Sequence, residues 1–280
     1  MKHPAVLAAL LLAACGAAQP EGEAEPLVRF ALDGDDGVEA VDPNSATGSP
    51  APYDACEVIT FEQHRFADCI AEPSRHVVST RLGPAGGAPY RSFAAYSKAN
   101  PQAQVAFAMN GGMFDEEGRP IGYYVEDGER RQTLSRADGP GNFHLKPNGV
   151  FFGTGSSWQV LDTETFYQTV LERPQFGTQS GPMLVINGAI HPEITENGPS
   201  RLLRNAVGVD EQGRAHFVIS QGPISFGVIA RLFRDRLKTP NALFLDGTVS
   251  SLWDPVADRM DQRAPLGPLI VVKNKARAQE

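Results

Sequence analysis

The chain has 280 residues, of which 41% are hydrophobic and 21% are charged, a composition typical of a globular protein that buries one large core. Its net charge is -8 and its basic residues are scattered, so the basic surface that nucleic-acid binding requires is missing. Nucleic acid is therefore not an expected partner.

The N-terminus has the pattern of a bacterial targeting signal. Lys2 supplies positive charge, and residues 5–12 form an apolar stretch that is too short to span a bilayer. Leu12-Ala-Ala-Cys15 resembles a lipobox, which predicts cleavage before Cys15 and acylation of that cysteine; the alternative is an ordinary signal peptide with a chance cysteine. We expect residues 1–15 to be a lipoprotein signal peptide. The mature protein would then be lipid-anchored to a membrane on the periplasmic side of the bacterial cell envelope.

The next segment has the composition of a linker. Residues 16–54 are rich in Ala, Gly, Pro, Glu and Asp, which predicts a mostly disordered tether ahead of a folded domain over residues 55–280. With Cys15 set aside, Cys56 and Cys69 form an even pair in a chain that is expected to reach an oxidising compartment. We expect a disulfide between them that ties the first hairpin together and contributes roughly 3 kcal/mol.

Short strands, tight turns and a few helices are predicted along the domain. Asn187-Gly188 favours a type I′ turn between strands at Met183–Ile186 and Ala189–Ile190. Similar hairpins are expected at Asp127-Gly128 and Gln212-Gly213. Further strands are predicted over Glu57–Phe61, Arg75–Arg81 and Gln104–Met109, and helices over Ser92–Asn100, Asp162–Glu172 and Ser225–Leu237. These patterns indicate an α+β fold: a largely antiparallel or mixed twisted sheet with two or three packed helices in a single domain.

Two predicted strands end in a polar residue followed by glycine. Gln104–Met109 leads into Asn110-Gly111-Gly112, and residues 241–245 lead into Asp246-Gly247. The glycines remove side-chain bulk and permit positive φ, which allows backbone N–H groups to point at an anion. The alternative at each position is a plain tight turn.

Four motifs occur in a fixed order: Asn110-Gly-Gly-Met-Phe114, Gln179-Ser-Gly-Pro182, Arg204-Asn-Ala-Val-Gly208, and Leu245-Asp-Gly247 with Ser250. In order and spacing they resemble the phosphodiester glycosidase family, which includes the lysosomal uncovering enzyme. The likeness runs from about residue 75 to residue 273 and is strongest to small bacterial members of unassigned substrate. The uncovering-enzyme branch reads Asp-Gly-Gly-Gly-Ser where this chain has Asp246-Gly-Thr-Val-Ser250, so the same substrate is not implied.

The resemblance implies an enzyme, a hydrolase that cleaves the glycosidic bond of a sugar-1-phosphodiester or a related glycan. Asp246 would act as the nucleophile or as the base for water at an oxocarbenium-like transition state. Arg204 would clamp the phosphate, with Arg201 as a weaker substitute. Asn110 would complete the catalytic set by hydrogen-bonding sugar hydroxyls or the phosphate.

Binding roles are implied for seven neighbouring residues. Backbone N–H groups of Gly111, Gly112 and Gly247 would face developing charge. The same pocket would be lined by Gln179, Ser180, Gly181 and Ser250. The residues alone leave open a structural ion pair for Arg204 and a turn hydroxyl for Ser180.

Other chemistry has weaker support in the sequence. Asp115 and Glu126 are expected on solvent-facing turns, and His144 and His191 receive no role. No metal and no cofactor are expected, because the carboxylates lack EF-hand spacing and no zinc motif occurs. Two other functions stay open: a non-catalytic glycan-binding envelope lipoprotein, and an acyl-transfer hydrolase in which a histidine would have to lie beside Ser180.

Overall fold

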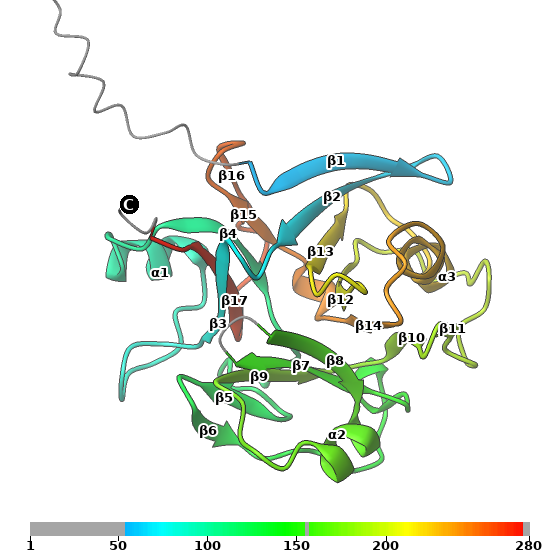
Figure 1. Ribbon diagram of the computed structural model, residues 1–280, viewed down its shortest axis with the longest axis horizontal. Coiled ribbons are helices and arrows are strands. Elements are labelled where there is room, and N and C mark those ends of the chain that lie inside the picture. The colour runs from blue at the N-terminus through cyan, green and yellow to red at the C-terminus, as the bar shows by residue number, and fades with distance from the viewer. Residues whose placement is uncertain (1–53, 155–156, 277–280) are drawn as a thin grey trace, which may run out of the picture. The chain divides into compact units, whose positions relative to one another are not determined.

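The structure is a computed structural model that describes residues 54–154 and 157–276 (Figure 1). The predicted signal peptide with Cys15, and residues 16–53 of the predicted tether, lie outside the described residues. The described residues form a single domain of antiparallel strands with three short α-helices. The predicted α+β class is therefore confirmed.

The strands are divided among three sheets, a division that the sequence patterns did not predict. The seven-stranded sheet has the order β1 (Cys56–Phe61), β2 (His64–Ala71), β13 (Ala215–Ser220), β12 (Asn205–Val209), β14 (Asn241–Phe244), β10 (Met183–Ile186) and β11 (Ala189–Ile190). The second sheet has the order β16 (Arg259–Met260), β15 (Leu252–Asp254), β4 (Val105–Asn110), β17 (Leu269–Asn274) and β3 (His76–Arg81). The third has the order β6 (Glu129–Gln132), β5 (Tyr124–Glu126), β9 (Phe176–Ser180), β7 (Gly149–Thr154) and β8 (Ser157–Asp162).

One aromatic side chain from each sheet meets in a shared core. The Phe217 ring of β13 lies 5.3 Å from the Phe107 ring of β4 and 5.5 Å from the Phe151 ring of β7. Because successive side chains of a strand point to opposite faces, Ala108, next to Phe107, faces away from this core. The outward faces of the sheets are apolar too, and the helices cover them.

Each helix packs on the outward face of a different sheet (Figure 1). α1 (Phe93–Ala99) covers the second sheet, α2 (Thr163–Thr169) the third, and α3 (Phe226–Arg231) the seven-stranded sheet. The side chains of Ser92, Asp162 and Ser225 accept backbone hydrogen bonds at the three N-termini. α2 is shorter than predicted, and α3 continues as a π-helical turn over Leu232–Arg236.

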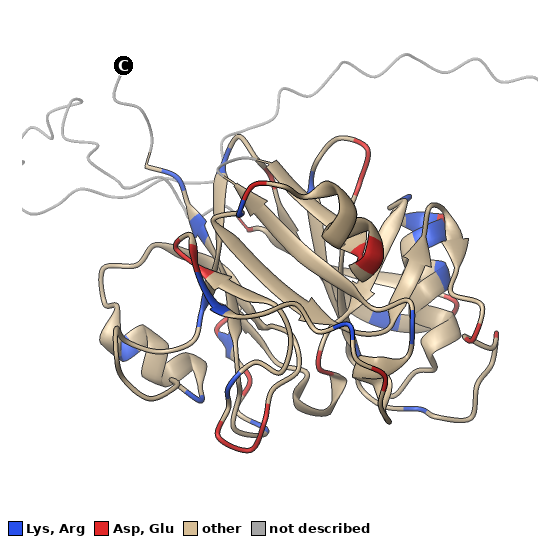
Figure 2. Ribbon diagram, turned by 90° about the horizontal axis from the view of Figure 1, so that it is seen from below, with Lys and Arg blue, Asp and Glu red and all other residues tan. Residues whose placement is uncertain are grey.

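The predicted hairpins are confirmed. At the Asn187-Gly188 turn both residues have positive φ, 49° and 81°. In the first hairpin Cys56 and Cys69 lie directly opposite each other on β1 and β2 and form the predicted disulfide. Acidic and basic residues are interspersed along the ribbon in Figure 2. No helix within residues 54–154 and 157–276 is both long enough and apolar enough to cross a membrane.

A buried histidine lies between two carboxylates in the seven-stranded sheet. His216 Nδ1 is 3.0 Å from Asp68 Oδ2 on β2, and His216 Nε2 is 3.4 Å from Asp210 Oδ2 in the β12–β13 turn. Arg214 pairs with the same Asp210 at 2.7 Å. Burial alone would lower the pKa of His216, but the hydrogen bonds and charges of Asp68 and Asp210 together raise it above its ordinary value.

Replacing both Cys56 and Cys69 with Ala should lower the free energy of unfolding by about 3 kcal/mol, because the two ends of the hairpin lose their covalent closure. Urea titration followed by circular dichroism measures this loss. Wild-type protein titrated under a reducing agent should lose the same amount. An unchanged midpoint in both samples would contradict the prediction.

The His216 cluster should make stability depend on pH. The pKa of His216 is raised in the folded state, so its contribution is complete below the ordinary pKa near 6.5 and is lost as pH rises through the folded-state pKa. His216→Asn should therefore cost more unfolding free energy at pH 6 than at pH 9, as measured by urea titration at each pH. His64→Asn, at a half-buried position outside the cluster, is the control. A cost for His216→Asn that does not change with pH would refute this assignment.

Candidate functional site

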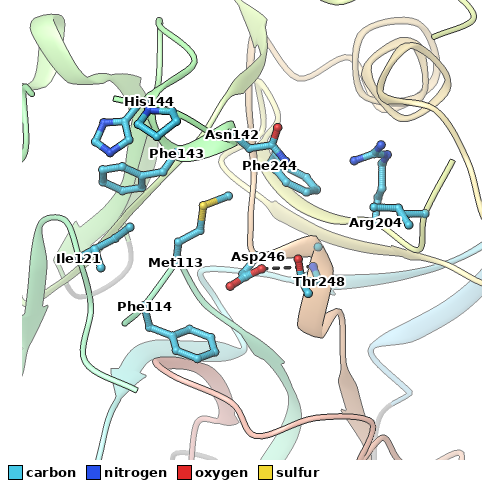
Figure 3. Close-up of a pocket in the computed structure, with 14 residues that line it drawn as sticks. Met113, Phe114, Ile121, Asn142, Phe143, His144, Arg204, Phe244, Asp246 and Thr248 are labelled. Atoms are coloured by element: carbon cyan, nitrogen blue, oxygen red, sulfur yellow. Dashed lines mark hydrogen bonds between the residues drawn. The ribbon is translucent and has the colours of Figure 1, made fainter. Parts of the chain in front are cut away.

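Four loop segments surround a cavity of about 360 Å³ (Figure 3). They follow β4, precede β7, precede β12 and follow β14, so they come from all three sheets. The lining residues are Met113, Phe114, Ile121, Pro140, Gly141, Asn142, Phe143, His144, Leu202, Arg204, Phe244, Asp246, Gly247 and Thr248. Three predicted site residues, Arg204, Asp246 and Gly247, are among them.

The side-chain amide of Asn110 holds the Asp246 loop in place. Asn110 Nδ2 donates to the backbone carbonyl of Asp246 at 2.9 Å, and the backbone N–H of Asp246 donates to the carbonyl of Gly111 at 3.3 Å. Asn110 Oδ1 accepts from Asn205 Nδ2 at 2.8 Å and from the Ser251 backbone N–H at 2.9 Å. Asn110 is buried and does not line the cavity. Its contacts join the ends of the two predicted motif strands.

The carboxyl group of Asp246 is on the cavity wall, at the start of a 3₁₀ turn over Gly247–Val249. Its Oδ1 accepts from the backbone N–H of Thr248 at 3.2 Å, the dashed contact in Figure 3. Partial burial raises the pKa of Asp246, which that backbone hydrogen bond only partly offsets. A carboxyl group with a raised pKa in a cleft is suited to proton transfer or nucleophilic attack.

Arg204 is a buried cation with no acidic partner among the described residues. Its Nε donates to the carbonyl of Ile224 at 2.9 Å, and its Nη2 donates to the carbonyl and hydroxyl of Ser200 at 3.0 and 3.1 Å. The guanidinium carbon lies 3.6 Å from the centre of the Phe226 ring. Burial lowers the pKa of Arg204 to about 10, which leaves it charged at neutral pH. The structural ion pair that the residues alone left open for it is not found within residues 54–154 and 157–276.

The glycines after Asn110 serve close packing. The Gly111 N–H donates to the carbonyl of Pro268 at 2.7 Å, and the Gly112 N–H donates to the hydroxyl of Thr178 at 3.0 Å. A Cβ atom on Gly112 would lie 2.1 Å from the carbonyl oxygen of Gln179. Both N–H groups therefore have protein acceptors, whereas the sequence pattern suggested an anion for them.

The other predicted pocket residues lie behind the cavity wall. Gln179 is buried and uses its side-chain amide to join Tyr123, Ser135 and Thr163. Gly181 packs against Asn148, and the Ser250 hydroxyl donates to Asn205 Oδ1 at 3.2 Å. The Ser180 hydroxyl is buried and has no hydrogen-bond partner among the described residues. No histidine described here can therefore activate it, which removes the acyl-transfer alternative.

The structure differs from the sequence-based expectations at two polar residues, Glu126 and His144. Glu126 was expected on a solvent-facing turn, but it is buried and accepts from the Tyr124 hydroxyl at 2.9 Å, with Arg81 and Arg131 within 3.5 Å. His144 received no role, but it lines the cavity. Asp115 is on an exposed turn as expected, paired with Arg119 at 3.0 Å. Within the described residues no three His, Cys, Asp or Glu side chains gather closely enough to hold a metal ion.

Comparison with known proteins identifies the family. A family model for phosphodiester glycosidases matches residues 103–273, more than half of the chain. The chain belongs to the phosphodiester glycosidase family. It is 38% identical over 176 residues to YigE of Escherichia coli (strain K12), described as an uncharacterized protein, with 63% of this chain and 68% of YigE aligned.

Two solved structures share the fold of this phosphodiester glycosidase family member. One is the catalytic domain of zebrafish N-acetylglucosamine-1-phosphodiester alpha-N-acetylglucosaminidase, auto-inhibited by its pro-peptide (TM-score 0.54, 14% identity, 79% of this chain and 82% of that chain). The other is a hypothetical protein from Synechocystis (TM-score 0.50, 14% identity, 79% and 61%). At these identities the likeness establishes the fold alone.

Asn110→Ala should lower the free energy of unfolding by about 2–4 kcal/mol, because the Asn205 amide, the Ser251 N–H and the Asp246 carbonyl all lose a buried partner. Chemical denaturation measures the loss. Asn142→Ala, which truncates an exposed asparagine of the cavity wall, should stay within about 0.5 kcal/mol of wild type. Equal stability of the two variants would rule out the role given to Asn110.

Proposed function

We propose that the protein hydrolyses the glycosidic bond of a sugar-1-phosphodiester or related glycan. The supporting observation is the buried Arg204 guanidinium, which lines the same cavity as the Asp246 carboxyl group and has no carboxylate partner in the described part of the chain. A buried charge without a counter-charge is costly in the unbound protein. An anionic substrate would supply the missing negative charge. Because the chain belongs to the phosphodiester glycosidase family, we take this anion to be a phosphodiester.

In the proposed reaction Arg204 binds the phosphate and Asp246 acts at the sugar. Arg204 donates three hydrogen bonds, one to Ile224 and two to Ser200. Its Nη1 has no hydrogen bond to the described residues, so this atom is available to donate to a phosphate oxygen. Asp246 either activates a water that attacks the anomeric carbon or attacks that carbon itself, in which case water then hydrolyses the glycosyl–Asp246 ester. The bond from that carbon to the phosphate oxygen breaks, and free sugar and a phosphomonoester result. The phosphate leaves with the electron pair of that bond and needs little protonation.

We also propose that this reaction takes place in the cell envelope, with the protein anchored through acylated Cys15. The lipobox-like run before that residue supports the anchor. The Cys56–Cys69 disulfide agrees with an oxidising compartment.

Asp246→Asn should abolish release of free sugar, lowering kcat by about 10⁴-fold, as expected when a single catalytic group is removed. Arg204→Lys should lower kcat/KM by about 10²–10³-fold, because lysine lacks the planar fork. In wild type, kcat/KM should rise on the acidic side with an apparent pKa above the ordinary 3.8, because Asp246 must ionise against its burial. A reducing-sugar assay on a panel of sugar-1-phosphodiesters measures all three effects.

Asp258→Asn and Arg263→Lys are the matched controls, since both side chains are exposed and lie outside the cavity. Both should retain wild-type rates. Undiminished turnover by Asp246→Asn would disprove its catalytic role. Binding of diesters by wild type without release of any sugar would instead favour the non-catalytic glycan-binding protein.

A further inference from the structure

Two exposed aliphatic side chains line the cavity beside polar ones such as Asn142 and Thr248. Ile121 is 37% exposed and Leu202 is 54% exposed, and both line the cavity. They are two of only seven exposed large apolar side chains within residues 54–154 and 157–276. Apolar side chains that line a binding cavity contact the apolar part of its ligand.

The apolar surface continues inward. Met113, Phe114, Phe143 and Phe244 also line the cavity, and Figure 3 shows the Asp246 carboxyl group facing the side chain of Met113. A sugar ring stacks on flat aromatic faces, and the phenylalanines can supply these. The branched aliphatic side chains of Ile121 and Leu202 offer no such plane, and their burial is favourable only against another apolar group.

The charge inside the cavity is small. Arg204 is the only lysine or arginine among the lining residues, Asp246 is the only acid, and His144 is the third titratable group. One cation balances one phosphodiester charge. A diphosphate would bring a second negative charge into a site that already contains the Asp246 carboxyl group, and this unpaired charge would be costly.

We propose that the substrate is a sugar linked through a single phosphate to an apolar alcohol, whose alkyl or aryl group packs on Ile121 and Leu202. This inference rests on the proposed function and names its substrate class. The oxygen of water joins the anomeric carbon, and the apolar group leaves as its phosphomonoester. Nucleotide sugars, which contain two phosphates, are poor substrates.

The test compares three substrates that share one sugar: the methyl phosphodiester, the octyl phosphodiester and a nucleotide diphosphate sugar. Each methylene that packs on Ile121 or Leu202 should raise kcat/KM by about fourfold. The kcat/KM of the octyl diester should therefore exceed that of the methyl diester by at least about tenfold, mainly through a lower KM. The nucleotide sugar should react at least about tenfold more slowly than the methyl diester. The octyl diester is assayed below its micellar concentration without lipid, so that contact with Ile121 and Leu202 is separated from partition into a membrane.

Leu202→Ser and Ile121→Ser should each remove most of the octyl preference, because they lower kcat/KM for the octyl diester far more than for the methyl diester. Val256→Ser is the control, because Val256 is 40% exposed but lies outside the cavity. Equal kcat/KM for methyl and octyl diesters, or an equal loss for both in Leu202→Ser, would overturn the inference and leave the proposed function standing. An octyl preference that appears only with added vesicles would also overturn it.

If the proposed function itself is wrong, the assay gives a result that differs from those above. If no diester releases sugar, hydrolysis is refuted, and calorimetric titration of the methyl and octyl diesters then decides the inference by affinity. If the octyl diester binds more tightly than the methyl diester, and Leu202→Ser abolishes this difference, the result would support packing of the alkyl group on Ile121 and Leu202. Equal affinities would refute it.

Discussion

The position of Asp246 depends on one side-chain amide that joins two sheets. Asn110 ends β4 in the second sheet, whereas Asp246 follows β14 and Asn205 begins β12 in the seven-stranded sheet. An amide has both a donor and an acceptor at the same end, and Asn110 uses both. A carboxylate would lose the donor and a hydroxyl could not span the same contacts. The loops of the cavity are therefore placed by a residue that does not itself line it.

Two other buried ionisable groups, Glu126 and His216, differ from Arg204 in their surroundings. Glu126 is buried with two arginines nearby, and His216 is buried between two carboxylates, so each has opposite charge around it. Such pairing makes burial tolerable, because the partner replaces part of the lost hydration. Arg204 has only carbonyl and hydroxyl oxygens and the rings of Phe226 and Phe244 around it in the described residues. The fold can compensate buried charge, yet it leaves this one uncompensated at a cavity.

Local features of the fold could be predicted from the sequence because they depend on neighbouring residues. The Asn187-Gly188 turn, the strand β1 and the N-terminal ends of α1 and α2 all follow from short-range geometry. The three-sheet division could not be predicted, since it depends on pairings such as β4 with β17 between distant segments. Glu126 was misplaced for the same reason: the Asp127-Gly128 turn indicated exposure, but Arg81 from β3 packs over it.

The candidate site shows the same limit. Asp246 and Arg204 could be chosen because their motifs resemble a family, and both line the cavity. An asparagine before two glycines, however, has the same pattern whether its amide faces a ligand or another loop, so the structural role of Asn110 could not be separated from a binding role. His144 and Phe143 lie in a short 3₁₀ turn over Asn142–His144 that has no sequence periodicity, and only the folded chain brings them to the cavity that Asp246 lines.

The burial of Arg204 also determines how ionic strength acts on the site. Dissolved ions weaken attraction between exposed charges because they gather around each of them, but they cannot surround a guanidinium that is 1% exposed and flanked by aromatic rings. An anion drawn to this group would be held by short-range contact instead of by a diffuse field. Its affinity would change little between dilute buffer and concentrated salt.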